Sequence, residues 1–389
     1  MFRYLHHKIK EGLTQDYGGK PPIQVVYGAR RTGKSTLLKN AFPEATYIDV
    51  EKGQYIPDLN SRDVEKIRGI ISTHSSTLII DEFQRLDDPG LIAKVIFDHI
   101  PGVSLILSGS SAIEISNKAS ESMGGRALFH RLYPLTFFEK MNQDGLLKDP
   151  YHLEPLELKL ASQLPEILRY GLYPIPSIHI DKEQYLEVLI ESSLTKDILY
   201  LDIIRNTKVI KDLLILLAYQ IGQVVNCSEI AQRLGIDRST VSKYIELLEK
   251  LFIIFTVRPF RSKRRDEIGL SEKIYFYDVG VRNALIGQFG PPNVRADLGL
   301  LFENYIISEC MKLNDYFGRK YDLRYWRTKF GSEIDIVFVR GLEPISAFEI
   351  KYKKGSISSV FANTYSIKPQ LVTSDNFVSI LSQTFIDNE

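Results

Sequence analysis

Cysteine is scarce in this sequence, and so are the patterns that mark secreted or membrane-spanning chains. Cys227 and Cys310 lie far apart and form no CxxC pattern, which argues against a disulfide framework and against a cysteine zinc site. No apolar run approaches the roughly 20 residues needed to cross a bilayer. The first ten residues lack the apolar segment of a secretory signal. We therefore expect a cytoplasmic protein with no membrane partner.

An excess of one charge is also missing. The sequence has 49 basic and 48 acidic residues, so bulk charge indicates neither a nucleic-acid nor a membrane partner, and local charge has to be considered instead. No HxxxH or HExxH pattern occurs. What remains is a chain of 389 residues, 44% hydrophobic and 25% charged, which is typical of a globular protein with two or three domains.

The first third of the chain alternates short apolar runs with helical periodicity, which predicts an α/β fold with a parallel sheet. Runs such as Leu78-Ile79-Ile80 are apolar throughout, as expected for a sheet covered on both faces. The predicted strands are Ile23–Tyr27, Thr46–Val50, Thr77–Ile80 and Val103–Ser108.

A phosphate-binding loop is predicted directly after the first strand. The segment GARRTGKS, residues 28–35, matches GxxxxGK[ST], the Walker A pattern. Its glycines let backbone N–H groups point at phosphates, and the following helix adds its positive end. Lys34 would reach the β and γ phosphates of ATP, and the Ser35 hydroxyl would ligate Mg²⁺. The alternative is a glycine-rich turn with a surface lysine. The predicted cofactor-binding residues are Gly28, Ala29, Arg30, Arg31, Thr32, Gly33, Lys34, Ser35 and Thr36.

Two further strand ends complete the predicted nucleotide site. The run LIIDE, residues 78–82, is a Walker B candidate in which Asp81 would hold Mg²⁺ and Glu82 would polarise the attacking water. The alternative is an ordinary pair of carboxylates where a strand meets a loop. The run LILSGSS, residues 105–111, ends in small hydroxyl residues, so Ser108 or Ser110 could sense the γ-phosphate. A simple Ser/Gly turn would look the same.

Together these segments resemble an AAA+ ATPase over residues 20–140. The stretches GGRA, residues 124–127, and YPLTFFE, residues 133–139, are similar to a prokaryotic AAA+ family that carries a C-terminal nuclease-like domain. The resemblance implies that Arg126 contacts the γ-phosphate, with Arg131 as the rival. Either arginine could instead form a structural salt bridge. By analogy the resemblance also implies a homo-oligomer.

Residues 226–248 have the pattern of a helix-turn-helix. Ser228 is predicted to cap the first helix, Gly235 permits the turn, and Asp237 is predicted to cap the second helix. Two strands, Phe252–Val257 and Lys273–Tyr277, frame a basic loop, which predicts a winged helix with DNA as the partner. A protein–protein module is the alternative. The predicted DNA-contacting residues are Arg238, Lys243, Arg261, Lys263, Arg264 and Arg265.

The C-terminal hundred residues contain Asp335, Glu349 and Lys351, a pattern that resembles a PD-(D/E)XK nuclease. A helix, Gly299–Lys312, carries Glu303 and precedes strand-like segments at 323–327, 333–339 and 345–352. Glu349 and Lys351 would project from the same face of a strand. Asp335, Glu349 and Glu303 would bind Mg²⁺, while Lys351 would activate water. The alternatives are an inactive binding module and a salt-bridged edge pair.

The sequence thus predicts an α/β protein in four parts. These are an AAA+ P-loop core with a short N-terminal helix (1–140), a helical linker or lid (141–210), a winged helix-turn-helix (211–285) and a restriction-endonuclease-like α/β domain (286–389). The predicted function is that of an ATP- and Mg²⁺-dependent switch on DNA, with a metal-dependent nuclease-like domain. The alternative is an ATP-binding interaction protein whose winged helix and inactive nuclease-like domain dock protein partners.

Overall fold

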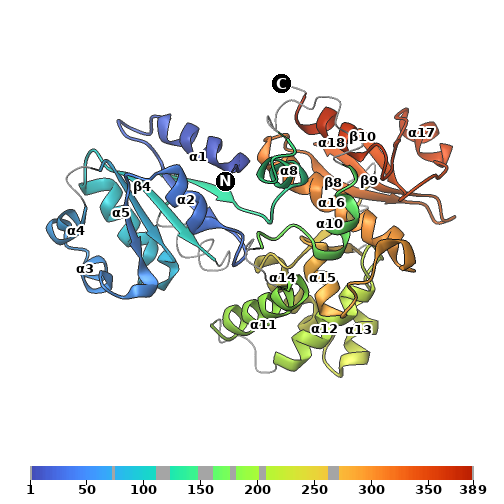
Figure 1. Cartoon of the computed structure of the whole chain (residues 1–389), viewed down its shortest axis with the longest axis horizontal. Helices are drawn as coiled ribbons and strands as arrows, with labels where there is room; N and C mark the ends of the chain where they lie inside the picture. The colour runs from blue at the N-terminus through green and yellow to red at the C-terminus, as the bar shows by residue number, and fades with distance from the viewer. Residues whose placement is uncertain are drawn as a thin grey trace. The chain divides into compact units, whose positions relative to one another are not determined.

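The structure, a computed structural model, describes residues 2–71, 75–110, 123–147, 161–175, 181–200, 207–261 and 271–387. Its contacts divide the chain into two units, Met1–Pro134 and Leu135–Glu389, shown from blue to red along the chain in Figure 1. The four-part division predicted from the sequence stays a prediction within these two units. In the part of the chain that the structure describes, no helix has both the length and the apolar composition to span a bilayer.

The N-terminal unit is built on a five-stranded sheet in the order β2-β3-β4-β1-β5, with every neighbouring pair parallel. The four strands predicted from the sequence are confirmed to within one residue at each end, and β5 is added at the edge. The bounds are β1 Ile23–Tyr27, β2 Thr46–Asp49, β3 Thr77–Asp81, β4 Ser104–Gly109 and β5 Ala127–Arg131.

Helices cover both faces of this sheet, as the apolar strands predicted. Alternate strand residues such as Val25, Ile80 and Leu107 pack with α3 to α5 in one core. The intervening residues, such as Ile79 and Ile106, are buried on the other face, where α1 contacts β1 and β5 and α2 contacts β4. The helices are α1 Tyr4–Thr14, α2 Lys34–Ala41, α3 Ile56–Ser61, α4 Val64–Ile70 and α5 Pro89–His99, with 3-10 turns η1 Val50–Lys52 and η2 Phe83–Arg85.

The C-terminal unit contains a six-stranded mixed sheet in the order β11-β10-β9-β8-β6-β7. Strands β6 and β7 form the predicted antiparallel hairpin, and β6 also pairs in parallel with β8. The hairpin is therefore an edge of the C-terminal sheet. The bounds are β6 Ile254–Pro259, β7 Lys273–Phe276, β8 Asp322–Arg327, β9 Glu333–Arg340, β10 Glu343–Ile350 and β11 Gln370–Val372.

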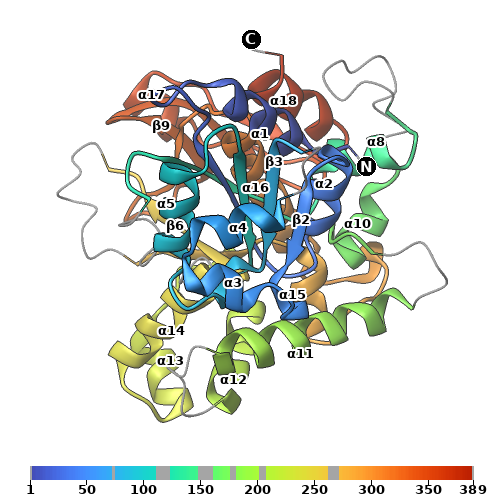
Figure 2. The ribbon, with the colours of Figure 1, turned by 90° about the vertical axis from the view of Figure 1, so that its left-hand side faces the viewer.

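Helices α14, α15 and α16 contact strands of this sheet, and the long helix α11 lies beside α12 and α15 (Figure 2). Helix α16 lies along the edge of β7 that is not paired with β6. There the Asn304 side chain donates to the carbonyl of Phe276 and accepts from its N–H, at 2.9 and 2.8 Å. The helices are α8 Phe137–Gln143, α10 Leu164–Tyr170, α11 Lys182–Tyr200, α12 Thr207–Tyr219, α13 Cys227–Leu234, α14 Arg238–Lys250, α15 Val279–Leu285, α16 Leu298–Tyr316, α17 Ser359–Tyr365 and α18 Phe377–Phe385, with a 3-10 turn η5 Pro292–Val294.

The predicted pair of helices with a tight turn is confirmed by α13 and α14. Gly235 has φ of +65° in the turn, a backbone conformation that glycine adopts without strain. The predicted cap of the first helix is wrong. Asn226, not Ser228, caps it by accepting from the N–H groups of Ser228 and Glu229. Asp237 does occupy the N-cap position of α14, but its side chain makes no capping hydrogen bond.

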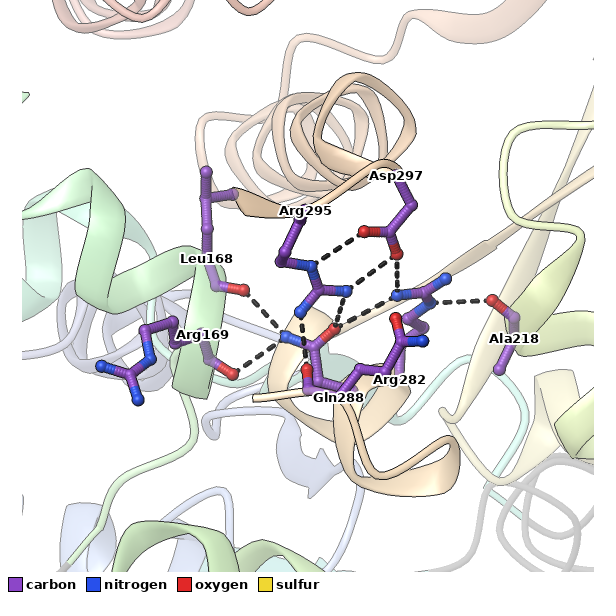
Figure 3. A network of polar contacts seen from close by, with 8 residues as sticks. Leu168, Arg169, Ala218, Arg282, Gln288, Arg295 and Asp297 are labelled. Carbon is purple, nitrogen blue, oxygen red and sulfur yellow. Dashed lines mark hydrogen bonds and ion pairs between the residues drawn. The ribbon is translucent and has the colours of Figure 1, made fainter. Parts of the chain in front are cut away.

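A polar network joins α10, α12, α15 and the start of α16 (Figure 3). Asp297 lies between two arginines, accepting from Arg282 at 2.5 Å and from Arg295 at 2.8 Å through each of its oxygens. Asn283 donates to the carbonyls of Leu168 and Arg169. Burial acts to raise the pKa of Asp297, but hydrogen bonds from Arg295 and the charge of Arg282 outweigh it and lower the pKa to about 2.

We expect Asp297→Asn to lower the free energy of unfolding of the C-terminal unit by about 2 kcal/mol at pH 7. A folded-state pKa below the ordinary value of 3.8 means that the carboxylate stabilises the fold above that value. The difference between parent and variant should therefore be full at pH 5 and above, and should shrink as pH falls from about 4 toward 2.

The measurement is urea-induced unfolding followed by fluorescence of Trp326, the single tryptophan, which is buried in this unit. Asp144→Asn is the control, because Asp144 pairs with Lys140 on the surface and its loss should cost less than about 1 kcal/mol. Equal decreases in the free energy of unfolding for the two variants would contradict this prediction.

Candidate nucleotide site and C-terminal charged cluster

The predicted phosphate loop connects β1 to α2 at the carboxyl edge of the parallel sheet. Gly28 has φ of +156°, and a Cβ there would lie 2.1 Å from the carbonyl oxygen of Leu132, so only glycine fits. Gly33 has a left-handed backbone conformation and occupies the N-cap position directly before α2. The Lys34 side chain is folded over the loop, where its ammonium donates to the carbonyls of Gly28 and Ala29, each at 2.8 Å. The loop therefore presents its lysine and the N-terminus of α2 together.

Asp81, at the end of β3, faces the start of α2. Its Oδ2 accepts from the Ser35 hydroxyl at 2.6 Å, and its Oδ1 accepts from the Ser108 hydroxyl. Strand β4 lies between β1 and β3, with Ser108 in register with both Val26 and Asp81. The structure thus brings together the two residues predicted to hold Mg²⁺, and it places Ser108 beside Asp81.

Sequence reasoning missed Tyr47, which also donates its hydroxyl to Asp81 Oδ2. Tyr47 lies on β2, the strand next to β3, and the ammonium of Lys39 lies 4.5 Å from its ring centre. Burial and the Asp81 carboxylate raise the pKa of Tyr47 well above its ordinary value, so the hydroxyl keeps its proton and remains a donor. An isolated tyrosine in an apolar strand carries no motif, so no pattern could have identified it.

Glu82 follows Asp81 and has φ of +55°, a left-handed conformation uncommon for a side chain of this size. Its carboxylate accepts from the Gln84 amide at 2.6 Å, and the same amide contacts the Ser110 hydroxyl at 3.3 Å. The predicted base and the second predicted sensor are therefore connected by one glutamine. Gln84 was also missed by sequence reasoning.

Arg3 is a buried residue that contacts the backbone of the phosphate loop. Its side chain is 1% exposed and donates to the carbonyl of Thr32 at 3.0 Å and to that of Tyr133 at 2.6 Å. The guanidinium thus ties the loop to the chain segment after β5. Its distance in sequence from both partners explains why no local pattern identified it.

The predicted γ-phosphate role of Arg126 is not supported within its own chain. Arg126 precedes β5, where its carbonyl accepts from Ile23 at the start of β1, whereas the phosphate loop follows the end of β1. Five residues of strand separate the two edges by about 16 Å. Arg126 instead donates to Asp98 at 3.3 Å. The rival, Arg131, is in register with Tyr27 beside the loop and donates to its hydroxyl at 2.9 Å.

In the C-terminal unit, Glu303 on α16, Asp335 on β9 and Glu349 on β10 form a second charged cluster with Lys351. The Lys351 ammonium lies 2.7 Å from Glu349 Oε1 and 3.6 Å from Asp335 Oδ2. Burial raises the pKa of Glu303 to about 7, and the neighbouring Asp335 acts in the same direction. Burial and Asp335 likewise raise the pKa of Glu349. The structure thus brings the four predicted residues to one place.

Two residues of β7 complete this cluster and were not predicted. The Lys273 ammonium lies 3.3 Å from Glu303 Oε1 and 2.5 Å from Glu333 Oε1, and the Tyr275 hydroxyl donates to Glu303 Oε1 at 2.7 Å. Burial acts to lower the pKa of Lys273, but Glu303 and Glu333 outweigh it, so the lysine stays charged. Among the described residues, no three His, Cys, Asp or Glu side chains are arranged as a ready metal site.

The predicted DNA-contacting residues are only partly described. Arg238 and Lys243 are exposed on α14. Arg261 donates to the carbonyl of Arg327 at 2.7 Å. Lys263, Arg264 and Arg265 lie outside the described residues.

A parallel sheet with a glycine-rich loop, a lysine and a Ser–Asp pair at its carboxyl edge defines a P-loop nucleotide-binding domain. Residues 20–141 match the family described as "AAA domain", in agreement with the P-loop architecture of this part of the chain. Two further segments match families described as domains of unknown function, DUF8612 over residues 161–291 and DUF4143 over residues 298–384.

Curated relatives match almost the whole chain. An uncharacterized protein of Haemophilus influenzae is 24% identical over 92% of this chain and 88% of its own length, and one of Methanocaldococcus jannaschii is 24% identical over 86% and 76%. Among solved structures, Aeropyrum pernix Orc1 in complex with DNA (14% identity, 72% of this chain and 91% of that one) and Thermotoga maritima RuvB (16%, 64% and 87%) both have TM-scores of 0.30. Such low scores support no argument about this chain.

Proposed function

We propose that this protein binds and hydrolyses ATP with Mg²⁺ at the edge of the N-terminal sheet. The observation that carries the proposal is the 2.6 Å hydrogen bond between Ser35 of the phosphate loop and Asp81 of β3. A hydroxyl and a carboxylate at one point are the oxygen ligands that Mg²⁺ accepts beside a nucleotide. Release of phosphate from ATP by the purified protein, with Mg²⁺ and with a chelator, tests the proposal.

Each residue of this site has a distinct part in the proposed reaction. Lys34 and the N–H groups of the loop bind the β and γ phosphates, while Ser35 and Asp81 would hold the metal ion, which would neutralise phosphate charge. Glu82 accepts a proton from the attacking water. Gln84 holds the Glu82 carboxylate in place, because its amide is the donor 2.6 Å away.

A second function is favoured by the cluster in the C-terminal unit, which we propose to be a metal-dependent nuclease-like site. Helix α16 precedes three antiparallel strands that carry Asp335 and Glu349 on neighbours β9 and β10. Glu349 Oε2 is buried and has no hydrogen-bond partner, an atom that a bound cation would satisfy. Asp335, Glu349 and Glu303 would be the ligands, and Lys351, which is 41% exposed on its side chain, would contact the phosphate or the water.

DNA is the proposed substrate of this second site, supported by the exposed cations Arg238 and Lys243 at the N-terminal half of α14. In this account ATP turnover in the N-terminal unit switches the action of the C-terminal unit. A protein-docking role for α13, α14 and the hairpin is the alternative, and it predicts no cleavage.

We expect plasmid DNA to be nicked by the parent protein in Mg²⁺ or Mn²⁺. Glu349→Gln and Asp335→Asn should each lower nicking by at least about 100-fold, because each removes an anionic ligand. Their effects should not add, because both belong to one site. Glu343→Gln is the matched control, since Glu343 lies at the far, exposed end of the same strand β10. No nicking of any DNA form would favour the docking alternative, and nicking that does not depend on metal would contradict the proposed metal site.

A further inference from the structure

The C-terminal cluster contains a lysine that the proposed nuclease chemistry does not use. Lys273 is the first residue of β7, and its side chain is 3% exposed. It differs in this from Lys351, whose side chain is 41% exposed and can move toward a substrate. A buried ammonium is stable only where anions surround it, and Lys273 lies against Glu303 and Glu333.

The position of Lys273 conflicts with a metal ion bound by all three predicted carboxylates. Glu303 Oε1 already accepts from Lys273 at 3.3 Å and from the Tyr275 hydroxyl at 2.7 Å. An oxygen with two donors directed at it has little lone-pair capacity left for a cation. Glu349 Oε2, in contrast, has no partner. Of the three carboxylates, Glu303 is therefore engaged by β7, Asp335 Oδ2 accepts from the N–H of Ile350 at 2.7 Å, and Glu349 keeps one open oxygen.

We propose that Lys273 is a built-in counter-ion that competes with a divalent cation for this site. The inference rests on the proposed metal site of the C-terminal unit and adds the residue that sets its affinity. The ammonium holds Glu303 through a hydrogen bond and places a positive charge beside the position where the cation would bind. Both effects oppose metal binding, because like charges repel strongly away from water. Only Asp335 and Glu349 then remain for a cation, and the site binds it weakly.

The test is calorimetric titration of the full-length protein with Mn²⁺ in the absence of nucleotide. Binding at the C-terminal site is defined as the Mn²⁺ binding that Glu349→Gln abolishes. Any Mn²⁺ held at the phosphate loop binds with or without Glu349, so this difference excludes it. We expect Lys273→Met to tighten this Glu349-dependent binding by at least about tenfold, because the competing charge is gone and Glu303 is released. Lys273→Gln, which keeps a donor for Glu303, should tighten it less.

Lys312→Met is the matched control. Lys312 is also buried and paired with a glutamate of α16, Glu309 at 2.7 Å, but it donates to Leu135 and lies outside the cluster. Its replacement should leave Mn²⁺ affinity unchanged. Glu349-dependent binding that is equal within twofold in parent and Lys273→Met would overturn the role of Lys273 and leave the metal site standing. Absence of such binding in both proteins would overturn the metal site as well. If neither Lys273 variant folds, the lysine is a structural residue and the proposal fails.

Discussion

Lys34→Ala should lower ATP hydrolysis by at least about 100-fold and weaken nucleotide binding. The ammonium lies over the phosphate loop, 2.8 Å from two of its carbonyls. Its charge would stabilise the transferred phosphoryl group, and a preorganised donor at such a position contributes about two to three orders of magnitude in rate. Phosphate release under saturating ATP and binding of a fluorescent ATP analogue measure the two effects.

Lys66→Ala serves as the control for this variant. Lys66 is an exposed lysine of α4 in the same unit, so its loss removes equal charge without touching the loop. The control should hydrolyse ATP like the parent. Turnover by Lys34→Ala within twofold of the parent would exclude the phosphate loop as the site of hydrolysis.

Glu82→Gln should keep ATP binding but slow hydrolysis by roughly 10²–10⁴, the usual contribution of a general base. Glutamine is close in size and removes only the proton-accepting charge. The Gln84 amide, 2.6 Å from Glu82 Oε2, can still donate to the carbonyl oxygen of the new side chain, so the loop conformation should survive. Single-turnover phosphate release together with equilibrium ATP binding separates the two steps.

Glu65→Gln is the matched control for this change. Glu65 is an exposed carboxylate on α4 that pairs with Arg68 on the surface, and its loss should leave turnover unaltered. A Glu82→Gln variant that hydrolyses ATP at the parent rate would assign the base to another residue. A variant that loses ATP binding as well would show that Glu82 maintains the loop.

The nucleotide site could be predicted from the sequence because its main parts are local. The phosphate loop is a contiguous motif, and Asp81 ends an apolar strand. Because parallel strands end at the same edge of a sheet, the two could be expected to lie close together. Tyr47 and Arg3 contact the same site from distant parts of the chain. Nothing in their own neighbourhoods distinguishes them from core residues, so only the fold reveals their contacts.

In the C-terminal unit, too, contacts between residues distant in sequence could not be predicted from local patterns. Asp335, Glu349 and Lys351 were predicted from their resemblance to the PD-(D/E)XK pattern, and Glu303 was added as an acidic residue on the preceding helix. Lys273 was assigned to a hairpin of a separate winged helix, yet β6 pairs with β8 and draws the hairpin into the same sheet. That pairing joins Arg258 to Arg324 across more than sixty residues, and a strand pattern does not specify its partner.

The choice between Arg126 and Arg131, which the sequence left open, depends on where each residue lies in the sheet. The glycine-arginine pair comes at the start of β5, and a parallel strand has its start at the edge away from the phosphate loop. The pairing register of β5 with β1 therefore indicates which arginine lies near the phosphate loop, whereas sequence position alone could not. It favours Arg131 for the nucleotide bound by the same chain.

Phosphate release from ATP by the full-length protein, measured with Mg²⁺ and then with Mg²⁺ chelated, tests the central claim most directly. The contact between Ser35 and Asp81 predicts release that rises in proportion to protein, disappears on chelation and returns when Mg²⁺ is restored. Release that is absent in Mg²⁺, or that is unchanged by chelation, would contradict the account.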